Sequence, residues 1–207
     1  MTNDFYSSQK QGYVANLIKT LNTSFMVFLI CGVVGFSVTL MGVGIMALGV
    51  SVAKDGRNAD GILLLGMTFM MIGIVVLIVG TIFGCILHYH LWKVIPEDIA
   101  RTTPGKAVGF LFIPLFNFYW MFVSCLGLSK DLNKALQQRG VHCQVSEGLG
   151  LALCIFGILS NLLINPSPGF SLIDFACLTL YLTACVIMIL FYKSVKDGAI
   201  ALLEQQE

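Results

Sequence analysis

The stretch Thr20–Ala53 reads TLNTSFMVFLICGVVGFSVTLMGVGIMALGVSVA and contains no charged residue over 34 positions. A second stretch, Gly61–Leu87, reads GILLLGMTFMMIGIVVLIVGTIFGCIL and contains none over 27 positions. A bilayer core of about 30 Å is crossed by about 20 apolar helical residues, so each stretch is long enough to span it. The two stretches predict a transmembrane hairpin joined by the short polar turn Lys54–Asp60.

The composition of the chain also indicates a membrane protein. Of its 207 residues, 57% are hydrophobic and 11% are charged, and the mean hydropathy is +0.88. A soluble domain would carry charge on about 25% of its residues, so the composition excludes that class. The formal net charge of +1 is uninformative as a total, and we expect no nucleic-acid partner.

Five stretches are apolar enough to be considered as membrane spans: Ser24–Ala53, Gly61–Trp92, Ala107–Ser129, Gly148–Ile164 and Leu172–Tyr192. The 12 lysines and arginines decide how many of them cross, because cytoplasmic flanks are enriched in both residues. If all five cross and the N-terminus is cytoplasmic, five cations lie inside and seven outside. If the third stretch enters and leaves by the same face, ten lie inside and only Lys54 and Arg57 lie outside. The pattern favours four spans with both termini in the cytoplasm, and the alternative is a proline-kinked fifth span.

The third stretch has its own reasons not to cross. Pro114 breaks a helix, and Asn117 is suited to cap a new helix that stops at Gly140. The later part of that helix has an apolar face of Leu128, Leu132, Ala135 and Leu136 and a polar remainder of Lys130, Asp131, Asn133, Lys134 and Gln137. Such a division is typical of a helix at a membrane interface. We predict a re-entrant or interfacial segment over 107–139 that packs against the spans.

The predicted fold is therefore an all-α integral membrane protein. It has four transmembrane helices in two hairpins, with a Pro-broken re-entrant or interfacial segment and an amphipathic helix between them. The predicted boundaries are a cytoplasmic N-terminal tail 1–23, a first hairpin 24–92, a cytoplasmic connector 93–147, a second hairpin 148–192 and a cytoplasmic C-terminal tail 193–207. The turn formers of Asn165–Gly169 join the helices of the second hairpin. The first apolar run is far longer than the core of a signal peptide, so we expect it to stay attached.

Glycines recur every seven residues in both helices of the first predicted hairpin. The first set is Gly35, Gly42 and Gly49, and the second is Gly66, Gly73 and Gly80, with Gly84 completing a GTIFG motif. Seven residues are nearly two helical turns, so each set lies along one stripe. Glycine stripes let two backbones approach closely in lipid, where burial alone does not drive helices together. We predict that these seven glycines pack helices, either against each other or against a partner chain.

The residues able to carry chemistry are few and scattered: His88, His90, Glu97, Asp98, His142, Cys143 and Glu147. His88 and His90 point about 200° apart on one helix, and no recognised ligand spacing joins them to the others. We expect solvated or interfacial histidines, an exposed Cys143, and interfacial aromatics at Tyr89, Trp92 and Tyr192. The sequence predicts no catalytic residue, no metal and no cofactor.

The segment His90–Ala135 carries a resemblance to a known family. Arg101–Phe110 reads RTTPGKAVGF, Phe112–Pro114 reads FIP, Asn117–Trp120 reads NFYW and Ser129–Asn133 reads SKDLN. This resembles the central motif of a family of uncharacterised multi-pass bacterial membrane proteins, which share an aromatic Phe-Ile-Pro-x-x-Asn core between two hydrophobic hairpins. The close likeness covers about a fifth of the chain. The resemblance implies a bacterial inner membrane and supplies no activity and no catalytic residue.

The same segment is the best candidate for a contact surface. Thr103–Lys106 combines a rigid proline turn, a permissive glycine and a cation at the level of the lipid headgroups. Arg101 and Lys106 are placed to hold an anionic headgroup or an acidic partner. The residues predicted to contact lipid or a partner are Arg101, Pro104, Gly105, Lys106, Pro114, Asn117, Tyr119 and Trp120. The alternative is that these features only secure an interfacial helix.

Three functional hypotheses remain from the sequence. The leading one is a non-enzymatic scaffold or accessory subunit that contacts membrane lipids and either a membrane-protein partner or a second copy of itself. The second is a small channel or permease in which the broken segment lines a cavity reaching Asn117. The third is an enzyme acting on lipid, which requires His88, His90, Glu97 or Asp98 to converge.

Overall fold

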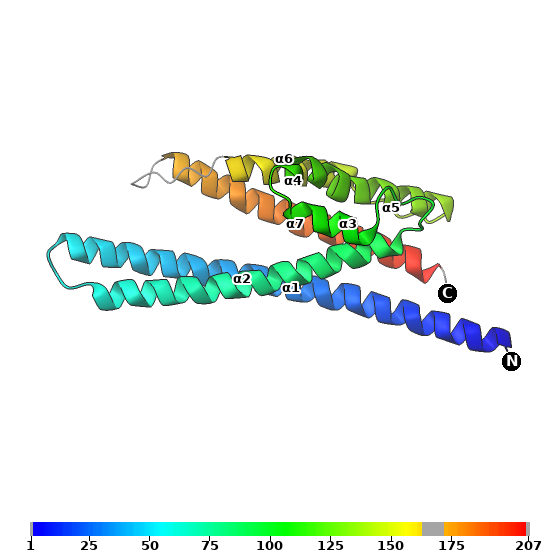
Figure 1. The fold of residues 1–207 in the computed structure, drawn as a ribbon, viewed down its shortest axis with the longest axis horizontal. Coiled ribbons are helices and arrows are strands. Elements are labelled where there is room, and N and C mark those ends of the chain that lie inside the picture. The colour runs from blue at the N-terminus through cyan, green and yellow to red at the C-terminus, as the bar shows by residue number, and fades with distance from the viewer. Residues whose placement is uncertain (1, 163–171, 206–207) are drawn as a thin grey trace. The chain divides into compact units, whose positions relative to one another are not determined.

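A computed structural model describes residues 2–162 and 172–205, and this part of the chain is helical with no strand. The helices are α1 (Thr2–Lys54), α2 (Asp60–Val94), α3 (Pro104–Gly109), the 3₁₀ turn η1 (Phe110–Phe112), α4 (Phe116–Met121), the π-helix η2 (Phe122–Leu126), α5 (Gly127–Gln138), α6 (Glu147–Leu162) and α7 (Leu172–Glu204) (Figure 1). The all-α class is confirmed. The predicted turn Asn165–Gly169 lies outside the described residues.

Among the residues that the structure describes, three helical segments are long and apolar enough to cross a membrane. They are Ser8–Lys54, Asp60–Val94 and Ala176–Glu204. Helix α6 is 16 residues long, or about 24 Å, and packs along α7. The structure therefore gives three helices of spanning length, and the fourth span stays a prediction.

The chain divides into two compact units. The hairpin unit is Thr23–Ile86, and the main unit is Met1–Asn22 together with Leu87–Glu207. In the hairpin unit, α1 ends at Lys54 and α2 begins at Asp60, as the polar turn predicts. Gly56 lies in this turn with φ +74°, a conformation that glycine adopts without a steric cost.

The two glycine ladders face each other inside the hairpin unit. A Cβ atom built on Gly42 would lie 2.6 Å from the backbone nitrogen of Met70 and 2.9 Å from the carbonyl oxygen of Gly66. A Cβ atom on Gly35 would lie 3.1 Å from the carbonyl oxygen of Gly73. The backbones of α1 and α2 therefore approach too closely for any side chain at these positions. The remaining three contacts pair Gly49 with Leu63, Gly80 with Cys31, and Gly84 with Phe28.

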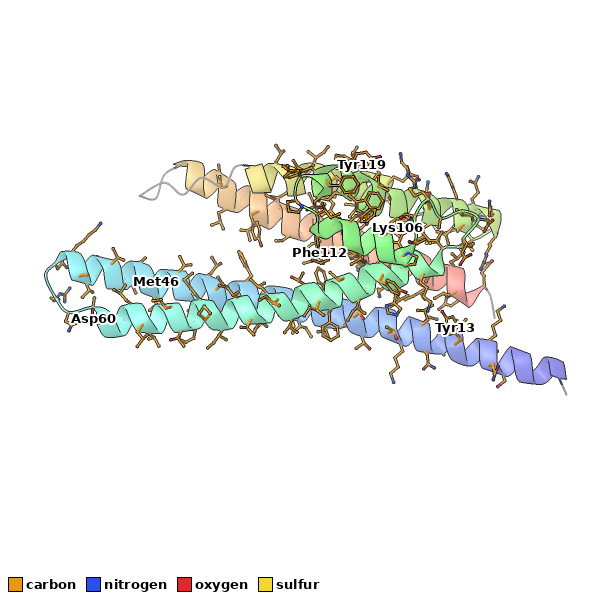
Figure 2. The ribbon with its side chains drawn as sticks, viewed as in Figure 1. Tyr13, Met46, Asp60, Lys106, Phe112 and Tyr119 are labelled. Carbon is orange, nitrogen blue, oxygen red and sulfur yellow. The ribbon has the colours of Figure 1, made fainter. Side chains whose placement is uncertain are left out.

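Large apolar side chains cover the outside of this hairpin. In the most apolar stretch of α1, and likewise of α2, only 11% of the residues are buried inside the protein. Figure 2 shows the side chains standing out from both helices of the hairpin. An apolar surface of this extent is compatible with a hydrocarbon surrounding.

The core of the main unit extends through both ends of the chain. Leu91 of α2, Leu132 of α5 and Val195 of α7 are fully buried. The segments predicted as tails are helical over 2–23 and 193–204. Both contribute apolar stripes at helical spacing to this core: Val14, Leu17 and Leu21 in α1, and Val195, Ala199, Leu202 and Leu203 in α7. The Nζ of Lys196 donates a hydrogen bond of 2.9 Å to Asn22, which ties α7 to α1.

The break at Pro114 is confirmed, but the predicted cap is wrong. Helix α4 begins at Phe116, so Asn117 lies inside its first turn, and the residue at the cap position is Leu115. The turn across the break already pairs the backbone groups, because the N–H groups of Phe116 and Asn117 donate to the carbonyls of Pro114 (2.7 Å) and Ile113 (2.9 Å). A side-chain cap is not needed there.

The end of α5 and its apolar face are confirmed. Gly140 has φ +68°, its N–H donates to Gln137, and the N–H of Val141 donates to Leu136, which is the Schellman arrangement that closes a helix at glycine. The four predicted apolar residues, Leu128, Leu132, Ala135 and Leu136, are at most 1% exposed. Helix α5 packs through this face against α6 and α7.

Replacement of Gly42 by alanine tests the close contact in the hairpin unit. We expect Gly42→Ala to destabilise the protein by about 1–3 kcal/mol, because the methyl group meets backbone atoms that cannot move aside cheaply. The matched control is Gly44→Ala, two residues along the same helix, where no atom lies within 4 Å of the new Cβ. Unfolding midpoints in detergent measure both. Equal midpoints for the two variants would contradict the contact.

Candidate functional site

An ion pair holds the two ends of the central segment together. The guanidinium of Arg101 donates to the carboxylate of Asp131 through Nε (2.9 Å) and an Nη atom (2.6 Å), and the backbone N–H of Arg101 adds a third bond of 3.0 Å. The Asp131 side chain is 1% exposed and that of Arg101 is 37% exposed. Residues 101 and 131 therefore lie in direct contact across the 29 intervening residues.

Asp131 corrects the sequence prediction, which placed it on the polar side of its helix. It lies three residues after Leu128 and four before Ala135, and this spacing puts it in the buried stripe. Burial of a carboxylate requires a partner, and Arg101 supplies one. The hydrogen bonds that Arg101 donates to the Asp131 carboxylate raise the pKa of Arg101 above its ordinary value, so the cation is retained throughout the neutral range.

Gly127 makes room for the stem of this arginine. A Cβ atom on Gly127 would lie 2.9 Å from Cδ of Arg101 and 3.2 Å from its Nε. The bidentate geometry therefore depends on a missing side chain at the start of α5 as well as on the carboxylate.

A chain of buried hydrogen bonds joins four elements of the main unit. His88 of α2 lies 2.6 Å from the hydroxyl of Ser124 in η2 through Nε2, and 3.2 Å from the hydroxyl of Tyr192 in α7 through Nδ1. Ser124 in turn donates to the carbonyl oxygen of Ala107 in α3 at 2.8 Å. His88 and Ser124 are at most 1% exposed, so the prediction of a solvated His88 is wrong, and the alternative of a position at the membrane interface stays a prediction.

The carbonyl at the end of this chain fixes the direction of every proton. The carbonyl oxygen of Ala107 can only accept, so the hydroxyl of Ser124 donates its single proton to it. The same hydroxyl must then accept a hydrogen bond from the Nε2–H of His88. His88 then carries no proton on Nδ1, and Tyr192 donates to it. This order leaves the imidazole unable to take a proton from Ser124, which is the step that a serine nucleophile requires.

Two tryptophans complete the surroundings of Ser124. The indole of Trp92 donates to the carbonyl oxygen of Ser124, and that of Trp120 donates to the carbonyl oxygen of Ala107, both at 3.2 Å. Trp92 is 1% exposed and packs inside the protein, and its predicted place at the level of the membrane interface stays a prediction. The π-helical turn of η2 is a rare local geometry that occurs frequently at functional sites.

The break at Pro114 exposes a patch that we call the apolar lip. Its members are Phe112, Ile113, Leu115, Phe116, Phe118 and Tyr119. Leu115 is 83% exposed and has φ +65°, which is the only positive φ of a non-glycine residue among the described residues. Behind the lip, Phe116 stacks on Trp120 with ring centroids 5.5 Å apart. Figure 2 labels Lys106, Phe112 and Tyr119 on this part of the main unit.

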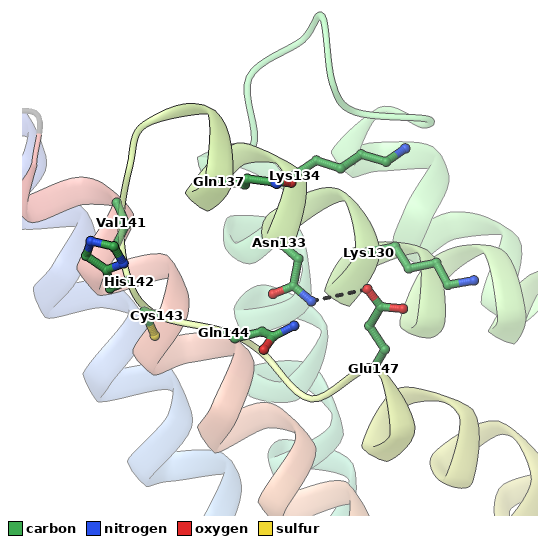
Figure 3. A pocket seen from close by; sticks show the side chains of 9 residues that line it. All are labelled: Lys130, Asn133, Lys134, Gln137, Val141, His142, Cys143, Gln144 and Glu147. Carbon is green, nitrogen blue, oxygen red and sulfur yellow. Dashed lines mark hydrogen bonds between the residues drawn. The ribbon is translucent and has the colours of Figure 1, made fainter.

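A polar groove lies between α5 and the loop 139–146. Its volume is about 530 Å³, and it is lined by Lys130, Asn133, Lys134, Gln137, Val141, His142, Cys143, Gln144 and Glu147. Asn133 shapes it, because its amide donates to the carbonyl oxygen of Val145 (2.9 Å) and to Glu147 (3.2 Å) and accepts from the N–H of Val145 (2.8 Å). Figure 3 shows the two lysines on one side and His142 with Cys143 on the other.

The residues predicted to contact lipid or a partner do not form one cluster. Lys106, Pro114 and Tyr119 lie on or beside the exposed surface, Trp120 supports the lip from behind, and Arg101 is engaged by Asp131. Asn117 is half-buried, and its Oδ1 has no hydrogen-bond partner in the structure. Their contact role stays a prediction.

The sequence did not identify the site of His88, Ser124 and Tyr192, since these residues lie 36 and 104 positions apart. One signal was present: His88 lies on the same helical face as Leu91, because residues three apart are neighbours. Within the described residues, no three His, Cys, Asp or Glu side chains are grouped closely enough to hold a metal.

Comparison of the chain with protein-family models, with curated proteins and with solved structures finds no match. The likeness of the central segment to a bacterial family stays a prediction.

Loss of the buried carboxylate tests the ion pair. We expect Asp131→Asn to destabilise the protein by about 1–3 kcal/mol, below the cost of breaking a fully buried pair because Arg101 keeps partial access to solvent. Asp98→Asn is the control, since Asp98 is exposed. Denaturation midpoints in detergent measure both, and an unchanged midpoint for Asp131→Asn would show that the pair contributes nothing.

Replacement of Ser124 by alanine tests the proton order. The variant leaves the Nε2–H of His88 buried without an acceptor, so we expect a loss of about 1–3 kcal/mol in stability. Ser37→Ala is the control, because Ser37 is exposed and bonds only within its own helix. A fluorophosphonate probe should not label the wild-type protein at Ser124. Labelling there would refute the proton order.

Proposed function

We propose that this protein is a non-enzymatic integral membrane protein, a scaffold or accessory subunit, whose central segment rests on the cytoplasmic surface of the membrane and contacts lipid. In this proposal, α6 serves as the fourth span and both termini are cytoplasmic. The membrane is the bacterial inner membrane, as the family resemblance implies. The binding partner is a membrane protein or a second copy of the chain.

The contact between Arg101 and Asp131 supports a segment that returns to its own side. If residues 107–129 crossed the bilayer, the two ends of the segment would be separated by about 30 Å of hydrocarbon. The ion pair joins them at 2.6 Å. This agrees with the charge pattern, which assigns ten of the 12 cations to the cytoplasm when the segment does not cross.

Leu115 is the observation that carries the lipid contact. Its positive φ costs about 1–3 kcal/mol for a residue other than glycine, and glycine or asparagine would be the usual choice. In water, a leucine side chain that is 83% exposed gains too little free energy from burial to offset this strain. In hydrocarbon, its burial contributes about 1.5–3 kcal/mol, which offsets the strain.

The arrangement of protons at His88 supports a function without catalysis. Its polar neighbours are Ser124 and Tyr192 rather than Glu97 or Asp98, so the convergence that a lipid enzyme requires is not present among these residues. The buried Oδ1 of Asn117 is the one observation that favours a channel or permease, because an unpaired acceptor suits a wet cavity.

An environment-sensitive dye on Leu115→Cys tests the proposed function in vesicles, in a Cys143→Ser background. We expect quenching by lipids that carry a spin label in the acyl chain and protection from aqueous iodide. Gln138→Cys is the control, because Gln138 lies exposed at the end of α5, away from the lip, and its dye should respond to iodide. Quenching of the dye at 115 by iodide alone would rule out insertion of the lip.

A further inference from the structure

The groove beside α5 contains two cations that the structure leaves available. Lys130 and Lys134 lie one helical turn apart on the exposed face of α5, and neither has an ion pair within the part of the chain that the structure describes. Arg101 differs from them, because Asp131 holds its guanidinium. Lys130 and Lys134 are therefore available to an external anion, whereas Arg101 is already engaged.

The remaining lining groups favour a polar, anionic ligand. Gln137, Gln144 and His142 supply hydrogen-bond donors, and Val141 is the single aliphatic side chain in the lining. Glu147 is the only carboxylate among the lining residues, and the amide of Asn133 bonds it at 3.2 Å. Two lysines against one carboxylate leave the groove with a net positive charge.

The position of the groove along the chain indicates the source of the anion. Glu147 is the first residue of α6, and the apolar run of this helix follows directly. Where an apolar helix enters a bilayer, its first turn lies at the level of the phosphates. Figure 3 shows the groove beside this first turn. A volume of about 530 Å³ is within the range of pockets that hold small molecules and suits a single headgroup.

We propose that the groove binds the phosphate headgroup of an anionic phospholipid, with Lys130 and Lys134 pairing with the phosphate and Gln137 and Gln144 donating to its ester or polyol oxygens. This inference rests on the proposed function, because it requires α6 to enter the membrane. It adds a class of lipid and a second contact, distinct from the apolar lip.

The test uses the full chain in nanodiscs of equimolar phosphatidylcholine and phosphatidylglycerol, with native mass spectrometry of the lipids that stay bound after release. We expect the wild-type protein to retain phosphatidylglycerol preferentially. The variant Lys130→Gln/Lys134→Gln should lose this preference by roughly tenfold or more, since each cation near an anionic surface contributes about fivefold. Glu147→Gln should strengthen the preference, because it removes the opposing charge and keeps an oxygen for Asn133.

The control is Lys10→Gln/Lys19→Gln, which removes two exposed cations elsewhere on the proposed cytoplasmic side. It should change the preference by less than about twofold. An equal loss in the control, or no loss in the groove variant, would overturn the proposal. Displacement of the bound lipid by excess glycerol 3-phosphate in solution would overturn the lipid as the source of the phosphate. The dye at residue 115 reads the lip separately, so failure of the groove leaves that result unaffected.

Discussion

The pairing of Arg101 with Asp131 constrains the rest of the main unit. It fixes the start of the central segment to α5, and through the buried face of α5 to α6 and α7. Once these two ends are joined, the residues between them must leave and return at one level. A helix that returns within so few residues must break, and Pro114 with Leu115 provides the break. The exposed lip is the consequence of this geometry.

The local features of the chain were predictable because they depend on near neighbours. The polar turn after Lys54, the break at Pro114 and the stop at Gly140 all follow from backbone chemistry within a few residues. The apolar face of α5 follows from helical spacing, and the glycine ladders from a repeat of seven. Each of these structures is determined by residues that lie close together in the sequence.

The features that sequence reasoning missed depend on partners far along the chain. Asp131 reads as a surface residue until Arg101 is placed beside it, and His88 reads as interfacial until Ser124 and Tyr192 supply its bonds. The segments 1–23 and 193–207 were predicted as tails because their apolar stripes are short, yet the described residues of these stripes are buried, and a hydrogen bond joins α7 to α1. The predicted cap at Asn117 was wrong for a local reason. Backbone hydrogen bonds across the turn already satisfy the N–H groups at the start of the helix, which the Asn117 side chain was expected to cap.

The polar groups of the main unit are of two kinds: those that are paired with one another inside the protein and those that lie at its surface. Protons in the chain from Tyr192 to Ala107 all point one way and end on a carbonyl, so this chain stiffens the packing and has no group left to exchange. The charge of Arg101 is likewise paired inside the unit, with the carboxylate of Asp131. The apolar lip and the groove with two lysines lie at the surface, and we propose that they meet the acyl chains and the phosphates of a bilayer. Under the proposed function, a surface divided in this way holds lipid and does not transform it.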